Sequence, residues 1–119
     1  MADIYTQAGE ELVVDLIANT VASLSAFIGW GTGAGTAAKA DTTLFTEASE
    51  SRVATTDSQP SVDKNQWLAQ ITAAGTKTIT NAGVFSASTG GTLLLHSDFT
   101  GVALALNDSI EFTFTLEQT

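Results

Sequence analysis

Apolar and polar residues alternate most clearly near the C-terminal end of the chain. Over residues 109–117, single polar residues separate four large apolar ones, Ile110, Phe112, Phe114 and Leu116. A period of two places all four on one face of an extended chain, so the pattern predicts a strand with one buried and one solvated face. A second alternating segment, 102–106, ends at the turn-forming pair Asn107-Asp108. This predicts a hairpin or a tight corner between two strands.

The middle of the chain predicts further strands. Residues 65–73 alternate apolar and polar side chains and are followed by a glycine-containing turn. Residues 77–85 and 92–96 lie on either side of Gly90-Gly91. Because a glycine pair favours a tight turn, we expect these two segments to be neighbouring antiparallel strands.

Residues 41–64 give weaker signals. Asp41 is a suitable N-cap, so a short helical turn is expected within 41–51. Residues 51–57 are rich in strand-forming types. Residues 58–64 are polar and contain the only proline, Pro60, which predicts a loop.

Residues 10–28 fit two patterns. A helical stripe is formed by Leu12, Val13, Leu16, Ile17, Val21 and Leu24, whereas Leu12, Val14 and Leu16 alone fit a strand. The regular spacing of short strands in the rest of the chain favours the strand interpretation. We therefore expect strands at 12–18 and 24–30, with a break at Asn19-Thr20.

Together these segments predict an all-β fold of seven or eight strands, an antiparallel β-sandwich of the jelly-roll or Ig type. The 119 residues correspond to a single domain, 1–119, with residues 1–11 as a candidate N-terminal arm. Composition agrees with this prediction. Only 14% of the residues are charged, and the 19 threonines favour strands over helices.

The charge balance limits the classes of partner. Thirteen acidic and four basic residues give a net charge of −9. Phosphate binding needs clustered cations, and the four here are scattered, so no nucleic-acid partner is expected. The chain has no cysteine, no signal-like start and no apolar run of membrane-spanning length. We therefore expect no membrane partner, and synthesis in the cytoplasm.

The glycine-rich segment 29–36 nominally contains the G-x-G-x-x-A pattern of dinucleotide-binding loops. That pattern needs a following helix whose N-terminus faces the pyrophosphate, and residues 37–41 do not begin one. We expect instead a strand that ends in a glycine loop, where the glycines allow positive φ or a close backbone approach.

His96 is the only histidine, and Ser97 and Asp98 follow it. Neighbours on one strand cannot converge into a triad, because successive side chains point to opposite faces. We therefore predict a surface or interface histidine.

The remaining candidates are carboxylates and tryptophans. Asp41, Glu47 and Glu50 fall in one segment, and Asp57 and Asp63 flank another. No EF-hand spacing is present, so solvated loop charges are expected, with weak calcium binding as an alternative. Trp30 and Trp67 favour the core or an interface over a sugar-stacking platform. No catalytic, cofactor-binding or metal-binding residue is predicted.

Several short blocks are characteristic in combination. They are Phe27-Ile28-Gly29-Trp30-Gly31-Thr32-Gly33, the segment 38–47 with Asp41-Thr42-Thr43-Leu44, Asn81-Ala82-Gly83-Val84-Phe85, Gly90-Gly91-Thr92-Leu93-Leu94, and 108–115 at the C-terminal end. In these blocks, which are spread over nearly the whole chain, the sequence resembles a family of small structural proteins of tailed bacteriophages.

This resemblance implies a non-enzymatic virion protein. The implied role is a capsid decoration, or cement, protein that sits on the phage head as a homotrimer and binds the major capsid protein. Contacts would come from residues 1–11 and the loops of 29–47. The alternative is a tail-associated or carbohydrate-binding β-sandwich module of the particle. For a particle coat, we expect the carboxylates on the exposed side and fewer of them at contacts.

Overall fold

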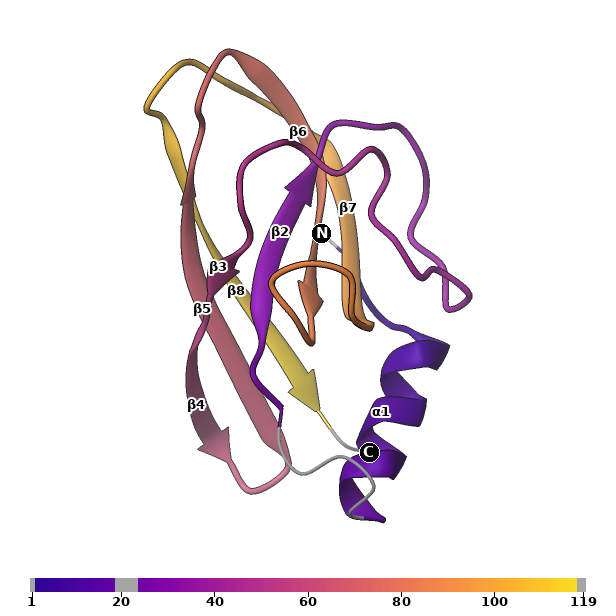
Figure 1. Cartoon of the computed structure of the whole chain (residues 1–119). Helices are drawn as coiled ribbons and strands as arrows, with labels where there is room; N and C mark the ends of the chain where they lie inside the picture. Colours follow the sequence, from indigo (N-terminus) through magenta and orange to yellow (C-terminus); the bar gives the residue numbers. More distant parts are fainter. Residues whose placement is uncertain (1, 19–23, 118–119) are drawn as a thin grey trace.

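The computed structural model describes residues 2–18 and 24–117 (Figure 1). The described chain forms eight strands and one helix, in the order β1 (Ala2–Tyr5), α1 (Gln7–Ile17), β2 (Phe27–Gly31), β3 (Val53–Ala54), β4 (Thr56–Ser61), β5 (Lys64–Thr72), β6 (Lys77–Phe85), β7 (Leu93–Leu104) and β8 (Ser109–Glu117). One sheet has the order β1-β7-β6-β2-β3 and the other β4-β5-β8. All neighbours pair antiparallel, which confirms the predicted all-β sandwich.

The main core lies between the two sheets. Its largest fully buried members are Trp30, Phe114, Ile28, Ile71 and Ile79. The alternation of residues 109–117 is confirmed, since Phe112, Phe114 and Leu116 are buried and the residues between them face outward. A second, smaller cluster, Leu44, Phe85 and Leu93, is also buried. In β7, residues 93–97 are all buried, so both faces of that strand segment are covered.

The strand predicted at 12–18 is wrong, because residues 7–17 form α1. Thr6 caps the helix: its hydroxyl oxygen accepts a bond from the Gly9 amide at 3.0 Å and donates to the Leu93 carbonyl. The cap fixes the start of the helix and attaches it to β7. Leu12 is then buried while Val14 is exposed, which is the helical stripe and not the strand pattern.

The expected N-terminal arm also takes another form. Residues 2–5 pair with β7 in the register Ala2↔Asp98 to Tyr5↔Leu95, and residues 7–11 are the first turns of α1. Backbone pairing holds residues 2–5 to the sheet, and the Thr6 cap holds the start of α1 to β7. Met1 lies outside the described residues.

Two other boundaries differ from the predictions. The strand expected at 24–30 is β2, Phe27–Gly31, and the predicted break at 19–20 lies outside the described residues. The loop expected at 58–64 is largely the β4–β5 hairpin. Pro60 lies within β4, which is tolerated because β4 is an edge strand and needs no amide donor on its free side.

The turns follow their glycine and asparagine signals. Gly90 and Gly91 have φ of 61° and 72° in the connection between the antiparallel neighbours β6 and β7, as predicted. Asn107, with φ of 72°, lies between β7 and β8. These two strands belong to different sheets, so their connection is a corner and not a hairpin.

Candidate functional site

Most of the polar side-chain contacts gather on one long connection, residues 32–52, which we call the brace loop. It leaves β2, crosses beside the end of the sheet and returns at β3 (Figure 1). An isolated bridge pairs Gly31 with Glu47. Residues 41–51 contain no helix; the predicted N-cap Asp41 instead accepts a bond from the Ala38 amide at 2.8 Å, which stabilises a turn.

The glycines at the start of the brace loop allow two backbone segments to touch. The Gly33 amide donates to the Phe45 carbonyl at 2.9 Å, and Thr32 donates to Thr46 at 3.0 Å. A Cβ at Gly31 would lie 2.5 Å from the Phe45 oxygen, and one at Gly33 2.6 Å from the Thr46 hydroxyl. The glycine-rich segment therefore serves a close backbone approach, as predicted from its sequence.

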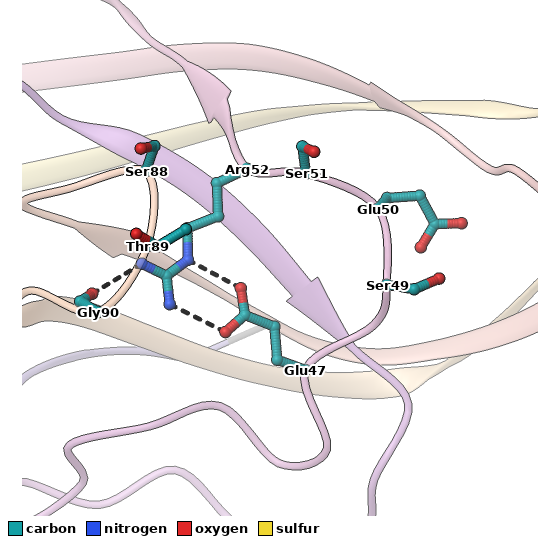
Figure 2. Close-up of a pocket in the computed structure, with 8 residues that line it drawn as sticks. All are labelled: Glu47, Ser49, Glu50, Ser51, Arg52, Ser88, Thr89 and Gly90. Carbon is teal, nitrogen blue, oxygen red and sulfur yellow. Dashed lines mark hydrogen bonds and ion pairs between the residues drawn. The ribbon is translucent and has the colours of Figure 1, made fainter.

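Arg52 ties the end of the brace loop to the β6–β7 connection (Figure 2). Its Nε and Nη2 donate to the two Glu47 carboxylate oxygens at 2.8 and 2.9 Å. Its Nη1 donates to the carbonyls of Ala87 at 3.0 Å and Gly90 at 2.8 Å. The guanidinium also lies 3.4 Å from the centre of the Phe85 ring, and only 7% of the side chain is exposed. This is a buried, bidentate anchor.

Glu50 makes the second anchor, toward the core and the β5–β6 turn. Its carboxylate accepts bonds from Trp30 Nε1 at 3.1 Å, from the Ala74 amide at 2.8 Å and from Lys77 Nζ. Burial raises the pKa of Glu50, but the bonds from Lys77, Ala74 and Trp30 outweigh it and hold the pKa at about 2. The carboxylate is therefore ionised at neutral pH.

A hollow of about 440 Å³ lies between these anchors. Figure 2 shows its lining, in which Ser88 and Thr89 lie near Arg52, Ser49 and Ser51 lie along the loop on the other side, and the Glu50 carboxylate points away from the Arg52–Glu47 pair. Glu47 accepts two bonds from Arg52, and Glu50 accepts bonds from Lys77, Ala74 and Trp30. The arrangement serves to hold loops together.

His96 is the centre of a third anchor and is fully buried. The prediction of a surface or interface histidine is wrong, because the brace loop covers the residue within the single chain and places the Phe45 ring 4.7 Å from the imidazole. Nδ1 lies 2.7 Å from Asp41 Oδ2, and Nε2 lies 3.1 Å from Asn81 Oδ1. The Asn81 amide is oriented by both backbone groups of Phe45. Both ring nitrogens thus lie within hydrogen-bond distance of a side-chain oxygen.

The neighbours of His96 form no triad with it. Ser97 has a buried hydroxyl with no hydrogen-bond partner in the described part of the chain, and it packs next to Ala82 on the strand pair. Asp98 accepts a bond from the Ala37 amide at 3.0 Å and so holds the brace loop. The three side chains thus have different surroundings, as expected for successive strand positions, which point to opposite faces.

The prediction of solvated loop charges is wrong for Asp41 and Glu50, whose side chains are 18% and 6% exposed, because each has a partner within the protein. Asp41 faces His96, Glu47 faces Arg52, and Glu50 faces Lys77. Asp57 and Asp63 accept bonds from their own neighbours, Thr55 and Ser61. Among the described residues, no three histidine or acidic side chains come close enough to hold a metal ion.

Trp30 and Trp67 are core residues, with 1% and 3% of their surfaces exposed, as their strand positions predicted. Neither ring is available to stack on a sugar. Trp30 Nε1 reaches Glu50, whereas Trp67 Nε1 has no partner within residues 2–18 and 24–117.

Two important residues were missed at the sequence level. Arg52 was noted only as a scattered cation, yet it makes four hydrogen bonds. Asn81 lies in the middle of β6, where asparagine is rarely favoured, and that misfit was the available signal. It hydrogen bonds to His96 and Phe45 at once.

Comparison with protein-family models and with curated proteins finds no match to this chain. In the described residues, no helix is long and apolar enough to cross a membrane.

Proposed function

We propose that this protein is a non-enzymatic structural component of a tailed-bacteriophage particle. Its role is that of a capsid decoration protein, which binds the assembled head and stabilises it. The site on the particle is the head surface, and the partner is the major capsid protein.

The observation that supports this proposal is the spatial convergence of the blocks that carry the phage resemblance. Gly31 and Gly33 pack on Phe45, the Phe45 amide donates to Asn81, and Gly83 packs on Leu44 and Leu93. Four blocks that lie far apart in the sequence therefore meet at the brace loop. A resemblance in these blocks is therefore a resemblance in the residues that hold this part of the fold together.

The state of the polar groups also favours a binding role over an enzymatic one. The buried or half-buried polar side chains Arg52, Glu50 and His96 have their partners within the protein. Such anchors make a rigid body with fixed surfaces. A rigid body that binds only the assembled shell stabilises it by mass action, by about 2.7 kcal/mol per site at a free concentration one hundred times its Kd.

Head binding is tested with three particles of the phage that encodes the chain: undecorated expanded heads, unexpanded proheads and isolated tails. We expect the purified protein to co-sediment with expanded heads and to raise the temperature at which they release DNA. Binding to tails alone would contradict the head assignment. Saturable binding to glycans with no binding to heads would favour the carbohydrate-binding alternative.

The homotrimer is a separate part of the proposal. Each chain carries a net charge of −9, and the repulsion between chains opposes association in dilute buffer. We therefore expect trimers to form on the shell or at high salt. Sedimentation equilibrium at increasing salt would then show a species of three times 12.3 kDa. Single copies on the shell that do not contact one another would refute the trimer.

A further inference from the structure

One side of the sandwich is not covered by a strand in the described part of the chain. β7 and β8 are joined by the corner at the end of the molecule away from α1 (Figure 1), but they belong to different sheets and do not pair. β1 covers β7 only as far as Asp98. β8 is the last strand of its sheet on the side away from β5. We call the gap between residues 99–104 of β7 and residues 109–117 of β8 the open side.

An apolar groove of about 370 Å³ runs along the open side. Its apolar walls come from both strands: Phe99, Val102, Ile110 and Phe112. Val102 is 39% exposed, although it pairs with the fully buried Ile79. The other side of the sandwich differs, because the chain crosses there from β3 to β4 and the Thr55 amide bonds to Ala26 at 3.0 Å. The core is therefore accessible at the open side.

The charge along the open side has one sign. The outward-facing residues of β8 are Ser109, Glu111, Thr113, Thr115 and Glu117, with no basic residue among them. Every lysine and arginine of the chain is engaged in an ion pair, Lys39 with Glu10, Arg52 with Glu47, Lys64 with Glu117, and Lys77 with Glu50. Glu111, which lines the groove, has no cation among these pairs.

We propose that the open side receives an extended strand from a partner protein. The strand pairs with the free edge of β8, places alternate apolar side chains in the groove between Val102 and Ile110, and places basic side chains beside Glu111. Backbone pairing supplies affinity in this mode, and the alternate side chains supply selectivity. The period of two matches the two faces of β8, one apolar and one acidic.

A second copy of this chain fits the open side less well than a basic strand. Two copies bring together two bodies of charge −9, and neither has an unpaired lysine or arginine to place against Glu111 of the other. The partner is therefore a different protein with an extended segment of alternating apolar and basic residues. This inference does not depend on the phage assignment.

The test uses the full chain and a fluorescent peptide of alternating valine and lysine, nine residues long to match β8. We expect saturable binding by fluorescence anisotropy that weakens with salt. Amide hydrogen exchange should slow in β8 and little elsewhere. A peptide of the same length with glutamate in place of lysine should bind at least tenfold more weakly, since like charges on adjacent strands repel.

Two substitutions localise the binding. Glu111→Lys is exposed and should not affect folding; it should weaken the lysine peptide about tenfold and strengthen the glutamate peptide. Val102→Asp should weaken both peptides by blocking the groove. Leu106→Asp is the matched control, because Leu106 is 60% exposed at the corner and does not line the groove; it should leave binding unchanged.

Three results would overturn the proposal. The first is that the Glu111→Lys variant still binds the lysine peptide more tightly than the glutamate peptide. The second is protection from exchange on strands other than β7 and β8. The third is protection of β8 that rises with protein concentration in the absence of peptide, which would identify a second copy as the occupant.

Discussion

The brace loop and the open side differ in which groups they bury and which they leave exposed. At the brace loop, charged side chains are buried and matched, as Arg52 is with Glu47 and the Gly90 carbonyl. At the open side, a strand edge and apolar side chains such as Val102 are left accessible. Anchors of the first kind stabilise the fold, and surfaces of the second kind are typical of binding sites. Substitutions in the two regions should therefore have separable effects, on stability in one and on binding in the other.

The largest loss of stability is expected from Arg52→Ala. This change leaves the Glu47 carboxylate and two backbone carbonyls without their donor in a site where the arginine is 7% exposed. Removing one partner of a buried pair costs about 3 kcal/mol, measured by urea unfolding. Lys64→Ala is the matched control, because its pair with Glu117 is about half exposed and should cost less than about 1 kcal/mol. Equal losses in the two variants would contradict the special role of the brace loop.

Glu50→Gln should cost about 2 kcal/mol at neutral pH, because the amide cannot replace an ionised acceptor for Lys77. The loss should depend on pH. The pKa of Glu50 is about 2 in the folded protein against an ordinary 4.5, so its contribution to stability is complete above pH 4.5 and disappears as pH falls toward 2.

Urea unfolding of the wild type and of Glu50→Gln across that range tests this prediction. The gap between their free energies of unfolding should narrow steadily from pH 4.5 to pH 2. A gap that stays constant would show that the effect of the substitution is one of packing and not of charge.

The two tryptophans give a smaller and closely matched comparison. Trp30→Phe removes the bond to Glu50, whereas Trp67→Phe removes an indole N–H that has no partner among the described residues. Both changes remove similar volume from the core. Trp30→Phe should therefore be the more destabilising by about 1.5 kcal/mol, measured by thermal unfolding. A larger loss for Trp67→Phe would mean that the bond to Glu50 contributes little.

How far the sequence predicts this molecule depends on the range of the interactions concerned. The sandwich, the strand at 109–117 and the buried Trp30 and Trp67 follow from periodicity, which is a local signal. The helix at 7–17 is one of the two patterns that residues 10–28 fit, and the spacing of strands elsewhere favours the wrong one. The Thr6 cap is a local physical signal that outweighs that spacing.

The brace loop could not have been predicted in the same way. The burial of His96 depends on contacts with Asp41 and Asn81, 55 and 15 residues away, and no periodicity encodes those. The glycine-rich segment predicted a close backbone approach but not its partner, Phe45. Such sites are determined by tertiary packing. In a single sequence, their only signal is a residue that is unusual for its element, such as an asparagine in the middle of a strand.

The smallest effect on stability is expected at the open side. Glu111 is an exposed residue of the edge strand β8, and Glu111 itself makes none of the ion pairs. The free energy of unfolding of Glu111→Lys should therefore differ from that of the wild type by less than about 0.5 kcal/mol. Urea unfolding on the same preparation used for peptide binding gives both quantities. A large change in binding with an unchanged stability would separate the two regions in one variant. A loss of stability as large as that of Arg52→Ala would instead mean that the edge of β8 is part of what holds the sandwich together, and the distinction between the two regions would fail.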